Sequence, residues 1–127
     1  MLKNINWVAH QYNTLDFKTT LLPSSTLPIL LVEKIYDPNY ETVLFYFHID
    51  GQPVNPAVWD QDDPFVPVLK EKDADGAWQL LDWNQLDGAI NDEWRIFARA
   101  AADDKAPILM LWSALDILKA QGRSPSF

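Results

Sequence analysis

The chain has 127 residues, of which 48% are hydrophobic and 22% are charged, and it contains no cysteine. This length and composition are typical of one folded domain, and the lack of thiols excludes disulfides, thiolate metal sites and cysteine nucleophiles. The net charge of -8 opposes direct binding to nucleic acid or to anionic membranes, and the sequence shows neither a signal peptide nor a membrane span, so we expect a soluble cytoplasmic protein.

The N-terminal segment has the spacing of an amphipathic helix. Apolar residues recur at intervals of three and four, and Asn4 is placed to cap the helix. The apolar positions are Ile5, Val8, Ala9, Tyr12 and Leu15. Residues 17–23 alternate too little to predict more than a loop with at most a short strand.

Two β-hairpins are predicted in the middle of the chain. Residues 29–36 and 42–50 are rich in β-branched and aromatic side chains, and they flank the turn-forming sequence DPNYE. Residues 66–72 and 77–83 flank the sequence DADG, whose glycine stands where a positive φ is required. Between the hairpins, residues 51–67 include four prolines and three aspartates, which predicts a long loop.

After Trp83 the apolar spacing changes to that of helices. Start signals at Asn84 and Asn91 predict a kinked helix that ends near Asp103, and a last helix follows from Pro107 and ends at Gly122.

The predicted fold class is therefore α+β. An antiparallel sheet of about four strands, in two hairpins, packs against an N-terminal helix and two C-terminal helices. Residues 1–122 are expected to form this single domain, and residues 123–127 a mobile C-terminal tail.

Patterns of familiar catalytic or cofactor-binding motifs are absent from the sequence. The two histidines, His10 and His48, have no metal-ligand spacing, no serine lies in a G-x-S-x-G turn, and no glycine pattern for phosphates or dinucleotides occurs. The aspartates of the predicted loop and turn could approach one another as calcium ligands, but DADG lacks the further ligands of an EF-hand loop. We therefore predict no metal, no cofactor and no catalytic residue.

The negative charge is concentrated between Trp59 and Trp94, a window with ten acidic residues, two basic residues and four of the six tryptophans. Five of the acids fall in the predicted loop and turn, where carboxylates can be displayed without disturbing a core. Together with the neighbouring tryptophan they form the predicted partner-binding surface: Trp59, Asp60, Asp62, Asp63, Asp73 and Asp75. Trp59 either anchors a partner or pins the loop onto the sheet.

This surface predicts a small, non-catalytic interaction protein that covers a basic surface of a partner protein. An inhibitor such as a toxin immunity protein, or a phage inhibitor of a nuclease, fits this description because it occupies a nucleic-acid-binding or catalytic cleft. The expected partner is a basic protein, such as a toxin or nuclease, and not nucleic acid itself or a membrane.

Two alternatives remain open at this point. Tyr46, His48 and Asp50 share one face of the predicted 42–50 strand, so a small-ligand or metal-dependent site could form between this strand and the 51–67 loop. Such a site could be enzymatic, with a histidine base held by a carboxylate. The chain could instead be a subunit of a larger assembly, in which case apolar patches on the helices would stay uncovered.

Overall fold

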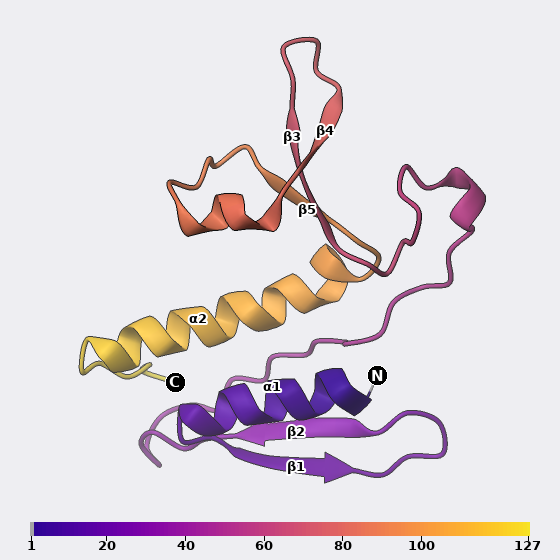
Figure 1. Cartoon of the computed structure of the whole chain (residues 1–127). Coiled ribbons are helices and arrows are strands. Elements are labelled where there is room, and N and C mark those ends of the chain that lie inside the picture. The colour runs from indigo at the N-terminus through magenta and orange to yellow at the C-terminus, as the bar shows by residue number, and fades with distance from the viewer. Residues whose placement is uncertain (1) are drawn as a thin grey trace. The chain divides into compact units, whose positions relative to one another are not determined.

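The computed structural model describes residues 2–127 and has an α+β fold with two antiparallel sheets, one of two strands and one of three (Figure 1). The predicted α+β class is confirmed. The chain divides into two compact units: the residues up to Ile49 together with Ala106–Phe127, which we call unit 1, and Asp50–Lys105, which we call unit 2.

Two expectations about the chain as a whole stay predictions, namely the single domain over residues 1–122 and the mobile tail over residues 123–127. Within the tail, Pro125 is buried and the ring of Phe127 lies 5.8 Å from the ring of Phe45. In the described part of the chain, no helix is long and apolar enough to cross a membrane.

Unit 1 contains helices α1 and α2 and the two-stranded sheet. Helix α1 spans Leu2–Thr14, strands β1 and β2 span Lys18–Leu22 and Ile29–Glu33, and helix α2 spans Ala106–Ala120. Within this unit, α1 lies between the β1–β2 hairpin and α2 (Figure 1). The predicted N-terminal helix is confirmed, although it starts before Asn4, which therefore lies inside its first turn and does not cap it.

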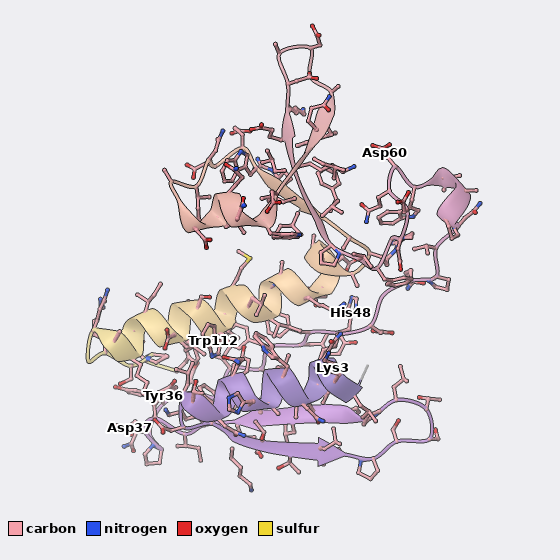
Figure 2. All side chains as sticks on the ribbon, in the orientation of Figure 1. Lys3, Tyr36, Asp37, His48, Asp60 and Trp112 are labelled. Atoms are coloured by element: carbon pink, nitrogen blue, oxygen red, sulfur yellow. The ribbon has the colours of Figure 1, made fainter. Side chains whose placement is uncertain are left out.

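The core of unit 1 forms where α1 meets α2. Its buried members are Tyr12, Leu15, Ile108 and Leu115. Two polar contacts also join the helices. The Tyr12 hydroxyl donates to the Ile108 carbonyl oxygen at 3.2 Å. The indole N–H of Trp112, which is labelled in Figure 2, donates to the Gln11 carbonyl oxygen at 3.0 Å. Apolar burial at this contact is the main force that holds unit 1 together.

Strand β2 pairs with β1, so the hairpin predicted between residues 29–36 and 42–50 is wrong. The antiparallel register sets Lys18 opposite Glu33 and Leu22 opposite Ile29. Opposite charges and apolar side chains across the two strands stabilise this pairing. Local turn chemistry does not decide whether the two segments that flank a turn pair with each other, because pairing depends on the cross-strand contacts that they can make.

The turn predicted at DPNYE nevertheless forms. The Asp37 carboxylate accepts the backbone N–H of Asn39 at 2.8 Å, but residues 42–50 beyond it form neither helix nor strand. Phe47 and Ile49, which share a face in the predicted strand, still pack against the core of unit 1. Two residues of the predicted apolar face are therefore directed to the core, although the segment forms no hydrogen-bonded strand.

Helix α2 confirms the predicted last helix. Pro107 lies in its first turn, where the missing N–H costs no hydrogen bond. Gly122 has a φ of +65°, and the backbone N–H of Arg123 donates to the Leu118 carbonyl oxygen at 2.9 Å. This left-handed glycine ends α2, as predicted from the sequence.

Unit 2 contains a three-stranded antiparallel sheet in the order β4-β3-β5, formed by β3 (Val68–Lys72), β4 (Trp78–Leu81) and β5 (Arg95–Phe97). The hairpin predicted around DADG is confirmed as β3 and β4. Gly76 in its turn has a φ of +83°, the conformation for which glycine was expected there.

The kinked helix predicted between Asn84 and Asp103 is also wrong. The segment instead forms a short 3-10 helix, η2 (Trp83–Asp87), and then strand β5. Strand β5 pairs with β3, and its Phe97 ring packs edge-to-face on Trp78 with centroids 4.8 Å apart. Strand hydrogen bonds and aromatic packing outweigh the weak helical preference of a segment that glycine interrupts. The fold therefore has one long C-terminal helix where two were predicted.

Candidate functional site

The predicted partner-binding residues all belong to unit 2, where they lie in the 51–67 loop and in the β3–β4 turn. Within the loop the regular structure is one turn of 3-10 helix, η1 (Pro56–Val58), which starts after Asn55. The Asn55 side chain accepts the backbone N–H of Ala57 at 3.2 Å and so caps this turn. The prediction of a long loop without strands is confirmed for these residues.

Asp60 holds a buried lysine. Lys70 of β3 is 4% exposed, and its ammonium lies 3.3 Å from the Asp60 carboxylate and 2.9 Å from the Asp60 carbonyl oxygen. The same ammonium lies 5.1 Å from the centroid of the Phe97 ring. A buried cation is tolerated only when its charge is paired and its N–H groups are bonded. Asp60, labelled in Figure 2, therefore has a structural role in addition to any role at the surface.

Asp63 and Asp73 bond to groups close to them in the chain. The Asp63 carboxylate accepts the backbone N–H of Phe65 at 2.8 Å. The Asp73 carboxylate accepts two backbone N–H groups of its turn, at 3.0 and 2.9 Å, and the side-chain amide of Gln79 at 2.8 Å. The Gln79 bond first, and then the backbone bonds, hold the pKa of Asp73 below its usual value. Both carboxylates thus act as turn-forming groups.

Trp59 packs on Arg99. The guanidinium carbon of Arg99 lies 5.3 Å from the centroid of the tryptophan ring, and the Arg99 backbone N–H donates to the Pro64 carbonyl oxygen at 2.6 Å. These contacts support the interpretation that Trp59 pins the loop. Asp62 and Asp75 are exposed, and within residues 2–127 their carboxylates make no hydrogen bond or ion pair.

The charge of the chain follows the division into units. Unit 2 contains thirteen acidic and five basic residues, whereas the rest of the chain contains five of each. The whole net charge of -8 therefore belongs to unit 2. Its field attracts cations, whether they are metal ions or basic side chains of a partner.

The residues of the alternative site have unequal surroundings. Tyr46 is 83% exposed, and so it does not line a cavity. His48, labelled in Figure 2, is half-buried near the end of the first segment of unit 1, and Asp50 is the first residue of unit 2. On the predicted face, the tyrosine side chain is therefore open to solvent, whereas the histidine side chain is partly covered.

A close approach of two backbone segments lies next to Asp50. A Cβ atom added to Gly51 would stand 2.7 Å from the Cβ of Ala100 and 3.2 Å from the Cγ of Arg99. The missing side chain of Gly51 thus lets the segment that carries Asp50 lie against the segment that leads into Asp103 and Asp104. These two aspartates have non-helical backbone angles and lie between β5 and α2.

Asp103 and Asp104 are functional candidates that the sequence pattern did not single out, because it placed them only at the end of a predicted helix. Two adjacent acids in the connection between two elements were the available signal, since polar residues in such connections often carry function. His48, Asp50, Asp103 and Asp104 all have interaction partners. Across residues 2–127, however, no group of three or more histidine, aspartate or glutamate side chains is arranged to hold a metal ion.

The chain is similar in sequence to a known protein. The Cys-Gly metallodipeptidase dug1 of Schizosaccharomyces pombe is 30% identical to this chain over 111 residues, which is 87% of the chain and 18% of the relative. The chain therefore spans less than a fifth of the length of this curated relative. No family model matches the sequence, and no solved structure matches it significantly.

Proposed function

We propose that this chain forms part of a metal-dependent peptidase, to which it contributes the carboxylates of Asp50, Asp103 and Asp104. The observation that carries the proposal is the 30% identity to a metallodipeptidase over 87% of the chain. The name of that relative joins a metal with the Cys-Gly dipeptide, so a short peptide is the corresponding substrate class for this chain.

The chemistry and placement of the three carboxylates support this proposal. Carboxylate oxygens and imidazole nitrogens are the usual zinc ligands of hydrolytic sites. All three aspartates belong to unit 2, and Gly51, next to Asp50, packs against Ala100, which precedes Asp103 by three residues.

The described residues do not fit a complete metal site by themselves. Structural and catalytic zinc sites take at least three protein ligands, and residues 2–127 hold no group of three candidate side chains so arranged. We therefore propose that these residues supply some of the metal ligands and that at least one further ligand completes the site.

Zinc binding by the full chain tests the proposal. Calorimetric titration with Zn²⁺ would compare the wild-type chain with Asp50→Asn and Asp104→Asn, and with Asp62→Asn as a matched control from the same unit. Loss of a group that only orients a metal ligand already costs about tenfold or more in metal affinity. We therefore expect each of the first two variants, which removes a ligand itself, to lose at least about tenfold in zinc affinity, and the control to bind as the wild type does.

Glycine release from Cys-Gly extends the test to the reaction. If the wild-type chain hydrolyses Cys-Gly in the presence of zinc, the rate should be lower for Asp50→Asn and Asp104→Asn and unchanged for Asp62→Asn. Equal zinc affinities in all four proteins would refute the assignment of Asp50 and Asp104 as ligands.

A second candidate function, binding of a basic protein partner through unit 2, is favoured by the charge distribution. The whole net charge of -8 lies in this unit, and Asp62 and Asp75 are the predicted acids without a structural bond in the described chain. Charge at a rim mainly speeds association, and salt screens it.

This candidate is tested by capture of a partner and measurement of its association rate against ionic strength. Asp62→Lys with Asp75→Lys should slow association and flatten its salt dependence, while Glu41→Lys in unit 1 should change neither. The same rate and salt dependence in all variants would exclude an acidic interface at these positions.

A further inference from the structure

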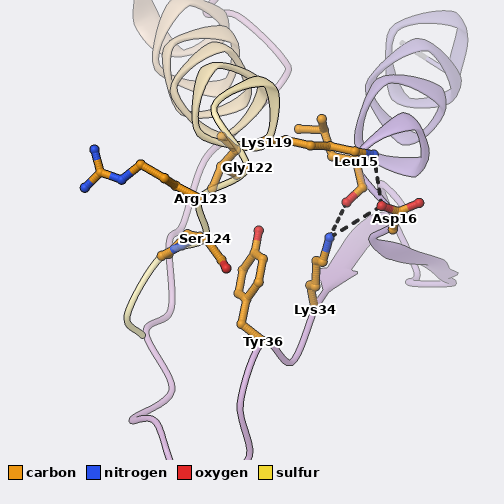
Figure 3. Close-up of a pocket in the computed structure, with 10 residues that line it drawn as sticks. Leu15, Asp16, Lys34, Tyr36, Lys119, Gly122, Arg123 and Ser124 are labelled. Carbon is orange, nitrogen blue, oxygen red and sulfur yellow. Dashed lines mark hydrogen bonds and ion pairs between the residues drawn. The ribbon is translucent and has the colours of Figure 1, made fainter.

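Unit 1 contains a cavity of about 290 Å³ where the C-terminal ends of α1 and α2 meet the residues that follow β2 (Figure 3). Ligand pockets commonly measure roughly 300 to 1,000 Å³, so this cavity lies at the lower limit of that range and has room only for a small molecule. Leu15 and Leu115, which are 3% and 7% exposed, give it an apolar lining. The ring of Tyr36 stands on one side, between Lys34 and Ser124 (Figure 3).

Basic side chains are concentrated around this cavity. Three of the five basic residues of unit 1 line the cavity, namely Lys34, Lys119 and Arg123. Of the five acidic residues of the unit, one lines it, namely Asp16. In a unit whose net charge is zero, the lining therefore carries an excess of positive charge. Such an excess favours an anionic ligand.

Both lysines keep donor capacity after their structural contacts are counted. Lys119 donates to the Thr14 carbonyl oxygen at 2.8 Å and to the Asp16 carboxylate at 2.9 Å. Lys34 donates to the Leu15 carbonyl oxygen at 2.5 Å and lies 3.8 Å from the same carboxylate. The Lys34 ammonium also lies 4.9 Å from the centroid of the Tyr36 ring. An ammonium has three N–H donors, so each lysine still has one that no hydrogen bond uses.

The same contacts hold the two ammonium groups in place before any ligand arrives. Asp16 fixes both lysines, and the exposed fractions of their side chains, 21% for Lys34 and 48% for Lys119, leave them open to the cavity. Groups that are already positioned lose less conformational entropy when a ligand binds. Arg123 adds a third cation at the rim, with its guanidinium directed away from Tyr36 (Figure 3).

We propose that this cavity binds a small organic carboxylate. The apolar part of the ligand packs against Leu15, Leu115 and the ring of Tyr36, and its carboxylate accepts hydrogen bonds from Lys34 and Lys119. Inorganic phosphate would leave the apolar lining uncovered, and a neutral ligand would form no charge-assisted hydrogen bond with the remaining N–H donors of the two lysines. The proposal is independent of the peptidase assignment, because it concerns unit 1 alone.

Titration of the full chain with four probes, followed by ¹H–¹⁵N correlation spectra, tests this site. The probes are benzoate, benzamide, acetate and inorganic phosphate, which separate the contributions of the ring and the charge. We expect benzoate to shift the signals of residues 34–36 and 119–125 and to bind about tenfold more tightly than benzamide, since a charge-assisted hydrogen bond is lost with the amide. Acetate and phosphate should bind more weakly than benzoate.

Variants of the lining complete the test. Lys119→Met should lower benzoate affinity about tenfold, and Lys18→Met, on β1 and outside the lining, should leave it unchanged. Because Lys119 also bonds to the end of α1, Arg123→Met serves as a second variant, and a loss of about threefold is expected from its more distant charge. Equal binding of benzoate and benzamide, tighter binding of phosphate, or shifts centred elsewhere would overturn the proposal.

Discussion

Replacement of Gly51 by alanine should destabilise unit 2, because the new methyl group has no room. It would stand 2.7 Å from the Cβ of Ala100, whereas carbon atoms in contact prefer about 3.5 to 4.0 Å. The obstacle is a short side chain fixed to the backbone, so one of the two segments has to move by about 1 Å. Overpacking of this kind costs about 1 to 3 kcal/mol, and the entropy that alanine removes from the unfolded chain returns about 0.4 to 1 kcal/mol. The expected net loss is about 1 to 2 kcal/mol.

The partner residue offers a way to relieve this clash. Ala100 is 6% exposed and has a φ of +63°, a conformation that costs a residue with a side chain about 1 to 2 kcal/mol. Ala100→Gly therefore removes backbone strain but also removes a buried methyl group worth about 0.8 kcal/mol and loosens the unfolded chain. These terms nearly cancel, so the single change should be close to neutral, and it should restore stability to Gly51→Ala.

Urea unfolding, followed by tryptophan fluorescence, would measure all four members of this double-mutant cycle. Four of the six tryptophans belong to unit 2 and report on it. We expect a coupling free energy of about 1 to 2 kcal/mol between the two positions, with unchanged m values. Additive effects, within about 0.5 kcal/mol, would show that the two residues are not in contact and would refute the reasoning.

Two further predictions concern groups whose pKa values are shifted. Burial raises the pKa of Tyr12 to about 12 from 10.0, so wild-type stability should fall as the pH rises from about 10 towards 12. In thermal melts, Tyr12→Phe should abolish this loss of stability at alkaline pH. At neutral pH the same variant should cost about 1 kcal/mol, because the hydrogen bond to the Ile108 carbonyl oxygen is lost. Hydrogen bonds, above all from Gln79, lower the pKa of Asp73 from 3.8, so its contribution is present above that value and is lost as the pH falls through the folded-state pKa. Asp73→Asn should therefore flatten the acid limb of the stability curve, and Asp75→Asn in the same turn is the control for the loss of one negative charge.

For the predicted partner-binding site, residue types alone identified local features but not contacts between distant segments. The sequence located the acidic residues and the turn that holds Asp73, because both are local properties. It did not reveal that Asp60 pairs with the buried Lys70, because that contact depends on how the loop lies against β3. Nor did it reveal the approach of Gly51 to Ala100, which are 49 positions apart in the chain. Contacts of this kind arise only when distant segments are brought together.

The sequence by itself determined those elements whose signals are short-range. Helix α1, helix α2 with its terminal Gly122, and the β3–β4 hairpin with Gly76 were predicted correctly, since helical spacing and turn residues act within a few positions of each other. The tertiary structure decided which strands pair. Residues 42–50 have the residue types of a strand but form none, whereas β2 pairs with β1 through contacts such as Lys18 with Glu33. The segment that becomes β5 has helical spacing, but it pairs with β3 and packs Phe97 on Trp78. A strand gains its hydrogen bonds only from a partner, and the identity of that partner is not encoded in any one segment.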